Sequence, residues 1–189
     1  MRRIVKICKE AGKRYKTVPA LGEIIDGELS IDVIRDVSYS DLLRRPEVKL
    51  DMNSIENMIQ KKRVLITGAG GSIGLELVKQ CLIFKPSEII CLDNNEESIH
   101  NINEMVKQVF PSFSIKTILA SVISKKECEK VFIENRPQIV FHAAAYKHVP
   151  IQELHPWAAV KTNIGGTLNI VELSDKYGAD KFVLVSTDK

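Results

Sequence analysis

The sequence predicts an α/β fold, a doubly wound parallel sheet of strand order 3-2-1-4-5 with a short N-terminal extension. Two observations support this prediction. Short apolar runs alternate with stretches of helical periodicity throughout residues 63–189, and a glycine cluster directly follows the first run. Such an alternation favours parallel strands joined by right-handed crossovers. The chain has 189 residues, 44% of them hydrophobic, which is enough for one such domain and an appendage.

The apolar runs and their boundaries place the individual elements. Five strands are expected, at 63–67, 88–92, 115–119, 138–142 and 181–186. Helices are expected over about 72–84, 96–109, 124–135 and 156–177. Prolines follow the first three of these helices, and proline cannot continue a helix because it lacks the backbone N–H.

The first 62 residues show no complete domain. A short helix over 2–11, a strand over 15–18 and a helix around 42–45 are expected there, and Asn53 or Ser54 is expected to cap a helix that runs to about residue 62. We therefore interpret residues 1–62 as the tail of a preceding domain plus a connector, and residues 63–189 as the α/β domain.

The glycine cluster has the spacing T-G-x-x-G-x-x-G between a strand and a helix. Gly68 permits the sharp turn, Gly71 lets a pyrophosphate approach the backbone, and Gly74 lets the helix pack close to the strand. The free amides at Ser72 and Ile73, at the positive end of the helix dipole, then hold the phosphates. The spacing predicts dinucleotide binding, and an ordinary tight strand–helix turn is the alternative.

An acidic residue, Asp93, follows the second strand, 19 residues after Gly74. An acid at this place binds the ribose hydroxyls of adenosine, and it would repel a 2′-phosphate, so NAD is favoured over NADP. Asp93 could instead cap the next helix, although Asn94 or Asn95 could take that role. Asn94 is also a candidate cofactor contact.

Small residues follow the fourth strand. Ala143, Ala144 and Ala145 leave room for a flat ligand against the backbone, or they let a helix pack closely, and the two interpretations are compatible. Lys147 could face phosphates or be a solvated loop charge. His148 is interpreted as a plain loop residue.

The chain ends at Ser186, Thr187, Asp188 and Lys189, directly after the fifth strand. In a doubly wound fold the ligand reacts in the crevice at this edge. A hydroxyl, an acid and a base occur there together. By composition alone this segment would be a capped turn, and its position makes it a candidate catalytic group.

Composition excludes several classes of protein. The net charge of +3 is too small to indicate nucleic-acid binding. None of the four cysteines forms a C-x-x-C pair, so they predict reduced thiols in a cytoplasmic protein rather than metal ligands or disulfides. No apolar run approaches the roughly 18 residues that a transmembrane helix needs.

These motifs together resemble the extended short-chain dehydrogenase/reductase superfamily, and more narrowly the capsule-type UDP-N-acetylglucosamine 4,6-dehydratases of bacterial polysaccharide biosynthesis. The similar stretches are V-L-I-T-G-A-G-G-S-I-G-L-E-L (64–77), H-A-A-A-Y-K-H-V-P-I-Q-E (142–153), T-N-I-G-G-T-L-N (162–169) and F-V-L-V-S-T-D-K (182–189). Residues 34–51 are similar to the connector in long, membrane-anchored members.

The resemblance implies NAD as cofactor, a UDP-sugar substrate, a homo-oligomer, and a location at the inner face of the bacterial membrane through segments outside this sequence. It implies hydride transfer from sugar C4 to NAD and back to C6. Thr187 would bond the C4 oxygen, Lys189 would remove the C5 proton, and Asp188 would protonate the departing C6 hydroxyl. Asn163 and Ser186 are further candidate cofactor contacts.

Two departures from the family pattern limit what the resemblance implies. The segment Ala120-Ser121-Val122 lacks the acid that contacts adenine in the family, so this contact is lost or falls to the Ser121 hydroxyl. The family also continues past S-T-D-K with a catalytic Tyr or Met, a Lys and a sugar-nucleotide domain. We therefore expect a fragment, without the C-terminal substrate domain, that binds NAD but does not turn over a sugar nucleotide. A C4 epimerase and a non-catalytic cofactor-binding or assembly module are the alternatives.

Overall fold

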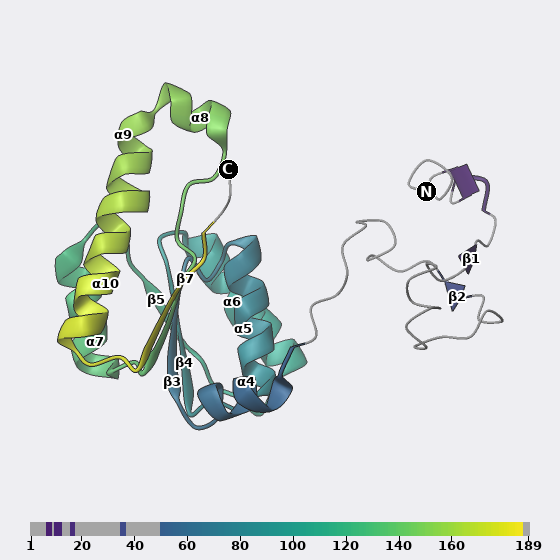
Figure 1. Cartoon of the computed structure of the whole chain (residues 1–189), viewed down its shortest axis with the longest axis horizontal. Coiled ribbons are helices and arrows are strands. Elements are labelled where there is room, and N and C mark those ends of the chain that lie inside the picture. Colours follow the sequence, from purple (N-terminus) through teal and green to yellow (C-terminus); the bar gives the residue numbers. More distant parts are fainter. Residues whose placement is uncertain (1–6, 9, 13–15, 18–34, 37–49, 187–189) are drawn as a thin grey trace. The chain divides into compact units, whose positions relative to one another are not determined.

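The computed structural model describes residues 7–8, 10–12, 16–17, 35–36 and 50–186, and the chain divides into two compact units, residues 1–50 and 51–189 (Figure 1). In the first unit, β1 (Lys16–Thr17) pairs antiparallel with β2 (Arg35–Asp36). The strand expected over 15–18 is described only at its centre. The helix expected over 2–11 lies largely outside the described residues, and the one around 42–45 lies wholly outside them.

The second unit is built on a parallel sheet with the order β5-β4-β3-β6-β7, which confirms the predicted order 3-2-1-4-5. Its strands are β3 (Arg63–Thr67), β4 (Glu88–Asp93), β5 (Lys116–Leu119), β6 (Ile139–His142) and β7 (Lys181–Leu184). Thr67 is in register with Leu92 and with His142, so the carboxyl ends of the three central strands lie level. Groups that follow these strands are therefore brought to one edge of the sheet.

Helices cover both faces of this sheet. The helices of this unit are α4 (Met52–Ile59), α5 (Ser72–Ile83), α6 (Glu96–Val109), α7 (Lys125–Asn135), α8 (Val149–Leu154), α9 (Pro156–Ala159), the π-helix η1 (Val160–Gly166) and α10 (Thr167–Lys176), and α8 and α9 lie beyond the sheet (Figure 1). Side-chain caps determine where some of these helices begin. The Asp51 carboxylate accepts from the Ser54 amide at 3.1 Å at the start of α4, and the Asn95 side chain accepts from the Ser98 amide at 2.8 Å at the start of α6. Because Asp51 is the cap, α4 begins earlier than the predicted start at Asn53 or Ser54.

The segment after β6 differs from the prediction in two ways. The single helix expected over 156–177 is divided into α9, η1 and α10, and its middle third is a π-helix. The six-residue α8 was not predicted, because it is too short for a clear period; Pro150 lies in its first turn, where the missing N–H has no helical partner to lose. Among the described residues, no helix is long and apolar enough to cross a bilayer.

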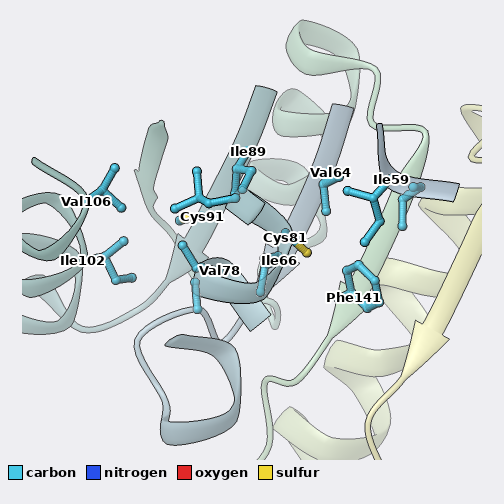
Figure 2. Close-up of a cluster of buried hydrophobic side chains, with 13 residues drawn as sticks. Ile59, Val64, Ile66, Val78, Cys81, Ile89, Cys91, Ile102, Val106 and Phe141 are labelled. Atoms are coloured by element: carbon cyan, nitrogen blue, oxygen red, sulfur yellow. The ribbon is translucent and has the colours of Figure 1, made fainter. Parts of the chain in front are cut away.

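Each face of the sheet has its own hydrophobic core. Successive strand side chains point to opposite faces, so Val64 and Ile66 join one core and Leu65 the other. The first core packs against α4, α5 and α6 (Figures 1 and 2), and the second against α7 and α10. Ile59 of α4 is 3% exposed in the first core. α4 therefore belongs to the compact α/β unit, although the sequence assigned it to the connector.

Phe132 of α7 should make a large contribution to folding. It is fully buried in the second core and stacks on Tyr177, with ring centroids 6.1 Å apart. Phe132→Ala should lower the free energy of unfolding by about 3–5 kcal/mol, because it removes buried apolar surface and leaves a cavity. Urea unfolding measures this loss. The neighbouring Ile133 is 51% exposed, so Ile133→Ala is the control and should change stability much less. Equal losses in the two variants would contradict the core described.

Candidate functional site

A cavity of about 250 Å³ lies at the carboxyl edge of the sheet. It is lined by the last two residues of β4, by residues that follow β3, β4, β5 and β6, and by one residue of η1. The lining residues are Gly68, Gly70, Gly71, Leu92, Asp93, Asn94, Asn95, Ser98, Ala120, Ser121, Val122, Ala143, Ala144, Ala145, Tyr146 and Thr162. Many of the candidate cofactor residues predicted from the sequence lie in this lining, because the strands that precede them all end at the same edge of the sheet.

Of the three glycines with the T-G-x-x-G-x-x-G spacing, at one side of this cavity, two leave no room for a Cβ and the third leaves room for one in close contact. Gly68 has φ +66°, and a Cβ there would lie 2.7 Å from the backbone of Ala144. A Cβ on Gly74 would overlap the Gly68 carbonyl oxygen. Gly71 has φ −67°, and a Cβ there would meet only the Gly68 oxygen, at 3.3 Å. The fold itself requires Gly68 and Gly74, whereas the space at Gly71 is open to a ligand.

The amino end of α5 adjoins this open position. Gly71 is the N-cap and supplies no side-chain hydrogen bond, and Ser72 and Ile73 are exposed. The first-turn amides of a helix have no intrahelical acceptor, and the helix dipole favours an anion beside them. The Lys147 ammonium donates to the Ser72 hydroxyl at 3.3 Å and adds a positive charge. This arrangement suits a phosphate group.

Asp93 connects the glycine turn to the next strand. One carboxylate oxygen accepts from the Gly70 amide at 2.8 Å, and the other from the Asn95 amide at 3.0 Å. Asp93 is 8% exposed and lines the cavity, as does the exposed Asn94. Because Asn95 caps α6, Asp93 does not take the capping role that was its alternative.

Gly70 is a feature that the sequence analysis did not assign. A Cβ there would clash with the Ser98 side chain on α6, so this glycine is needed for the turn to reach Asp93. Its signal in the sequence was only a fourth glycine in an already glycine-rich turn. Ser98 was also missed, since nothing in the helical pattern of 96–109 marks one residue as facing a cavity.

The loop after β6 is held by Asn163. Its Oδ1 accepts from the Tyr146 amide at 2.8 Å, and its Nδ2 donates to the Tyr146 carbonyl at 2.9 Å. Both ends of the amide are therefore used by the backbone, and Asn163 is not among the lining residues. Direct contact of Asn163 with a cofactor stays a prediction. The three alanines before Tyr146 do line the cavity.

His142 connects this loop to the glycine turn through a buried chain of hydrogen bonds. The Thr167 hydroxyl donates to the Asn163 carbonyl at 2.7 Å, so it accepts from His142 Nε2, 2.9 Å away. His142 Nδ1 is then the unprotonated nitrogen, and it accepts from the Thr67 hydroxyl at 2.6 Å. Burial lowers the pKa of His142 to about 4, which keeps the ring neutral. The chain thus joins β3, β6, η1 and the start of α10.

The proposed catalytic end of the chain is only partly described. The Val185 amide donates to the His142 carbonyl at 2.9 Å, so the segment after β7 runs beside the end of β6. Ser186 is exposed there. Thr187, Asp188 and Lys189 lie outside the described residues, and their roles stay predictions.

The fold and the glycine turn define a Rossmann-type α/β protein of the extended short-chain dehydrogenase/reductase superfamily. Residues 64–189 match the family described as "Polysaccharide biosynthesis protein", and the chain belongs to this family. It is 42% identical over 187 residues to the probable polysaccharide biosynthesis protein EpsC of Bacillus subtilis, covering 98% of this chain and 31% of that protein.

Two further relatives are dehydratases or epimerases by name. An inverting UDP-N-acetylglucosamine 4,6-dehydratase of Campylobacter jejuni is 34% identical, over 70% of this chain and 38% of its own. The chain is also similar to a solved structure, that of UDP-glucose 4-epimerase from Thermus thermophilus in complex with NAD. The two share 29% sequence identity and a TM-score of 0.55, over 66% of this chain and 37% of the epimerase chain. The chain therefore spans about a third of the length of the relatives it matches.

Protonation of His142 should weaken the fold in acid. An unfolded histidine titrates near pH 6.5 and the folded His142 near pH 4, so the unfolded state binds the extra proton between these values. Stability should fall as pH drops through this window, by about 2 kcal/mol between pH 7.5 and pH 5. Urea unfolding at a series of pH values measures it. His142→Gln should lose this part of the pH dependence, and the exposed control His148→Gln should keep it; identical profiles for both variants would contradict the role of His142.

Proposed function

We propose that this chain is the NAD-binding part of a nucleotide-sugar 4,6-dehydratase that acts on UDP-N-acetylglucosamine in bacterial polysaccharide biosynthesis. The observation that carries the proposal is the glycine turn, which is crowded at Gly68 and Gly74 but open at Gly71, beside the amino end of α5. An open backbone position next to a helix amino end suits a pyrophosphate. The family membership and the dehydratase and epimerase relatives support the reaction class.

The residues of the cavity fit the parts of NAD. The pyrophosphate would approach the backbone at Gly71, and the amides of Ser72 and Ile73 would hold it, with Lys147 adding charge. Asp93 retains unused lone pairs after accepting two amides and would accept from the adenosine ribose hydroxyls. Its charge disfavours a 2′-phosphate, so NAD is proposed over NADP. When bound, NAD supplies a reversible hydride acceptor.

The last three residues carry the proposed chemistry on the sugar. Thr187 would hydrogen-bond the oxygen on C4, which favours the ketone. Lys189 would then remove the acidified C5 proton, and Asp188 would protonate the leaving hydroxyl on C6. A UDP-sugar substrate, a homo-oligomer and a location at the inner face of the membrane belong to the same proposal for the whole protein.

Epimerisation at C4 is the second candidate function, because several similar solved structures are UDP-glucose 4-epimerases. Incubating the complete gene product with NAD and UDP-N-acetylglucosamine and analysing the products by NMR separates the candidates. A 4-keto-6-deoxy sugar supports the dehydratase, and a C4 epimer identifies an epimerase. NAD binding without any product would leave a binding or assembly module.

Gly71→Val should block NAD, and a circular dichroism spectrum like that of the wild type checks that the fold persists, since the new Cβ would lie only 3.3 Å from the Gly68 carbonyl oxygen. The backbone conformation at Gly71 suits any residue, and the new side chain would occupy the space proposed for the pyrophosphate. We expect at least about tenfold weaker binding of NAD by calorimetry, or 1.4 kcal/mol. The control Gly165→Ala adds a methyl group outside the cavity, where the nearest atom is 3.9 Å away, and should bind NAD normally. Unchanged affinity in Gly71→Val would rule out this position for the pyrophosphate.

Asp93→Asn should reduce the preference for NAD over NADP. The substitution removes the charge that repels a 2′-phosphate, but it also weakens one of the two hydrogen bonds that Asp93 accepts, from the Gly70 amide and from the Asn95 amide. The ratio of the two dissociation constants cancels that shared effect. We expect this ratio to shift toward NADP by about tenfold. A wild-type preference for NADP, or an unchanged ratio, would show that Asp93 does not face the ribose.

A further inference from the structure

The adenine end of the proposed NAD site lies on the far side of Asp93 from the glycine turn. β4 lies between β3 and β5 in the sheet, and Asp93 ends β4. With the pyrophosphate at the β3–α5 turn and the ribose at Asp93, the base falls at the loop that follows β5. Residues 120–122 of this loop and Thr162 of η1 line the cavity there.

Two contacts hold η1 and α10 against this loop. A Cβ on Gly166 would lie 2.6 Å from Val122 Cγ2, so only glycine allows η1 to approach this closely. The Asn169 side chain donates to the carbonyls of Val122 and Ile123, at 3.0 and 3.1 Å. Thr162 lies four residues before Gly166, on the same helix, and is thereby held at the cavity wall.

The hydroxyl of Thr162 is unpaired. Thr162 is 8% exposed, and its Oγ1 is shielded from solvent and has no hydrogen-bond partner among the described residues. Thr67 and Thr167, near the same edge, both use their hydroxyls in the His142 chain. Leaving a buried hydroxyl unpaired costs stability, which makes Thr162 an exception that calls for a partner.

We propose that the Thr162 hydroxyl hydrogen-bonds an edge of adenine and contributes to the selection of an adenine nucleotide, an inference that rests on the NAD site proposed above. The hydroxyl is shielded from solvent, so it would turn toward the cavity by rotation about the Cα–Cβ bond, which exchanges it with the methyl group. Threonine in helices occupies two such rotamers. A hydroxyl both donates and accepts, so it can pair with a ring nitrogen or with the 6-amino group. Gln152 also has an unpaired buried oxygen, but it does not line the cavity.

The test compares Thr162→Val with wild type, using ADP-ribose as the probe and calorimetry as the measurement. Valine keeps the shape of threonine and removes only the hydroxyl. We expect the dissociation constant to rise about three- to tenfold, the effect of one hydrogen bond. The melting temperature without nucleotide should not fall, because the hydroxyl that is removed has no partner in the part of the chain that the structure describes. A purely structural threonine would behave in the opposite way in both measurements.

Two variants make the result specific. Thr117→Val removes a hydroxyl that accepts from Asn103 at 3.2 Å outside the cavity, so it should leave ADP-ribose binding unchanged and lower the melting temperature. Ser121→Ala removes the other hydroxyl at this end, the alternative adenine contact, whose oxygen accepts from the Ile123 amide at 3.3 Å; it should raise the dissociation constant less than Thr162→Val does.

The outcomes separate this inference from the proposed function. Wild-type affinity in Thr162→Val, or a loss confined to Ser121→Ala, would overturn the role of Thr162 and leave the NAD site standing. A lower melting temperature in Thr162→Val would also overturn it, by showing a structural role. If the wild-type chain bound neither ADP-ribose nor NAD, the proposed function would fail, and the inference with it.

Discussion

Close backbone packing around the glycine turn determines where every group at the carboxyl edge of the sheet lies. The backbone at Gly68 lies against that of Ala144, and Gly74 lies against the Gly68 carbonyl, with no room for a Cβ at either place. β3, β6 and the amino end of α5 are therefore held together by main-chain atoms, which move less than side chains. The free amides at the start of α5 consequently have a fixed position beside Gly71, which lines the cavity.

Polar side chains secure this arrangement from two sides. Asp93 holds the turn through Gly70, and His142 holds the strand before it through Thr67. Through Thr167 and Asn163, the same imidazole also holds the loop that carries Lys147. A neutral buried ring suits this role, because it can accept on one nitrogen and donate on the other without a charge in the core. His142 thus connects the strand before the glycine turn to the helical segment that holds the loop after β6.

The fold and part of the site could be predicted from the sequence, and there is a physical reason why the rest of the site could not. The strand order, the glycine turn and Asp93 follow from short-range patterns, namely apolar period, glycine spacing and an acid after a strand. The functions of Gly70 and Asn163 could not be predicted, because each depends on a partner brought close only by the fold. The π-helix leaves no mark in V-K-T-N-I-G-G, where the same residues suit an ordinary helix.

The π-helix also fixes the length of the chain at this point. A π-helix holds one more residue than the α-helical path it replaces, because its hydrogen bonds reach one residue further. Deleting one residue within Val160–Gly166 would convert the segment to an α-helix, and α9 and α10 would keep nearly their present directions, because the α-helical path is one residue shorter. Ile170 and Leu173 would keep their places in the core, but residues inside the segment, including Thr162 and Asn163, would face new directions. Homologues that share this cavity should therefore keep the length of this segment, and a glycine at the position of Gly166.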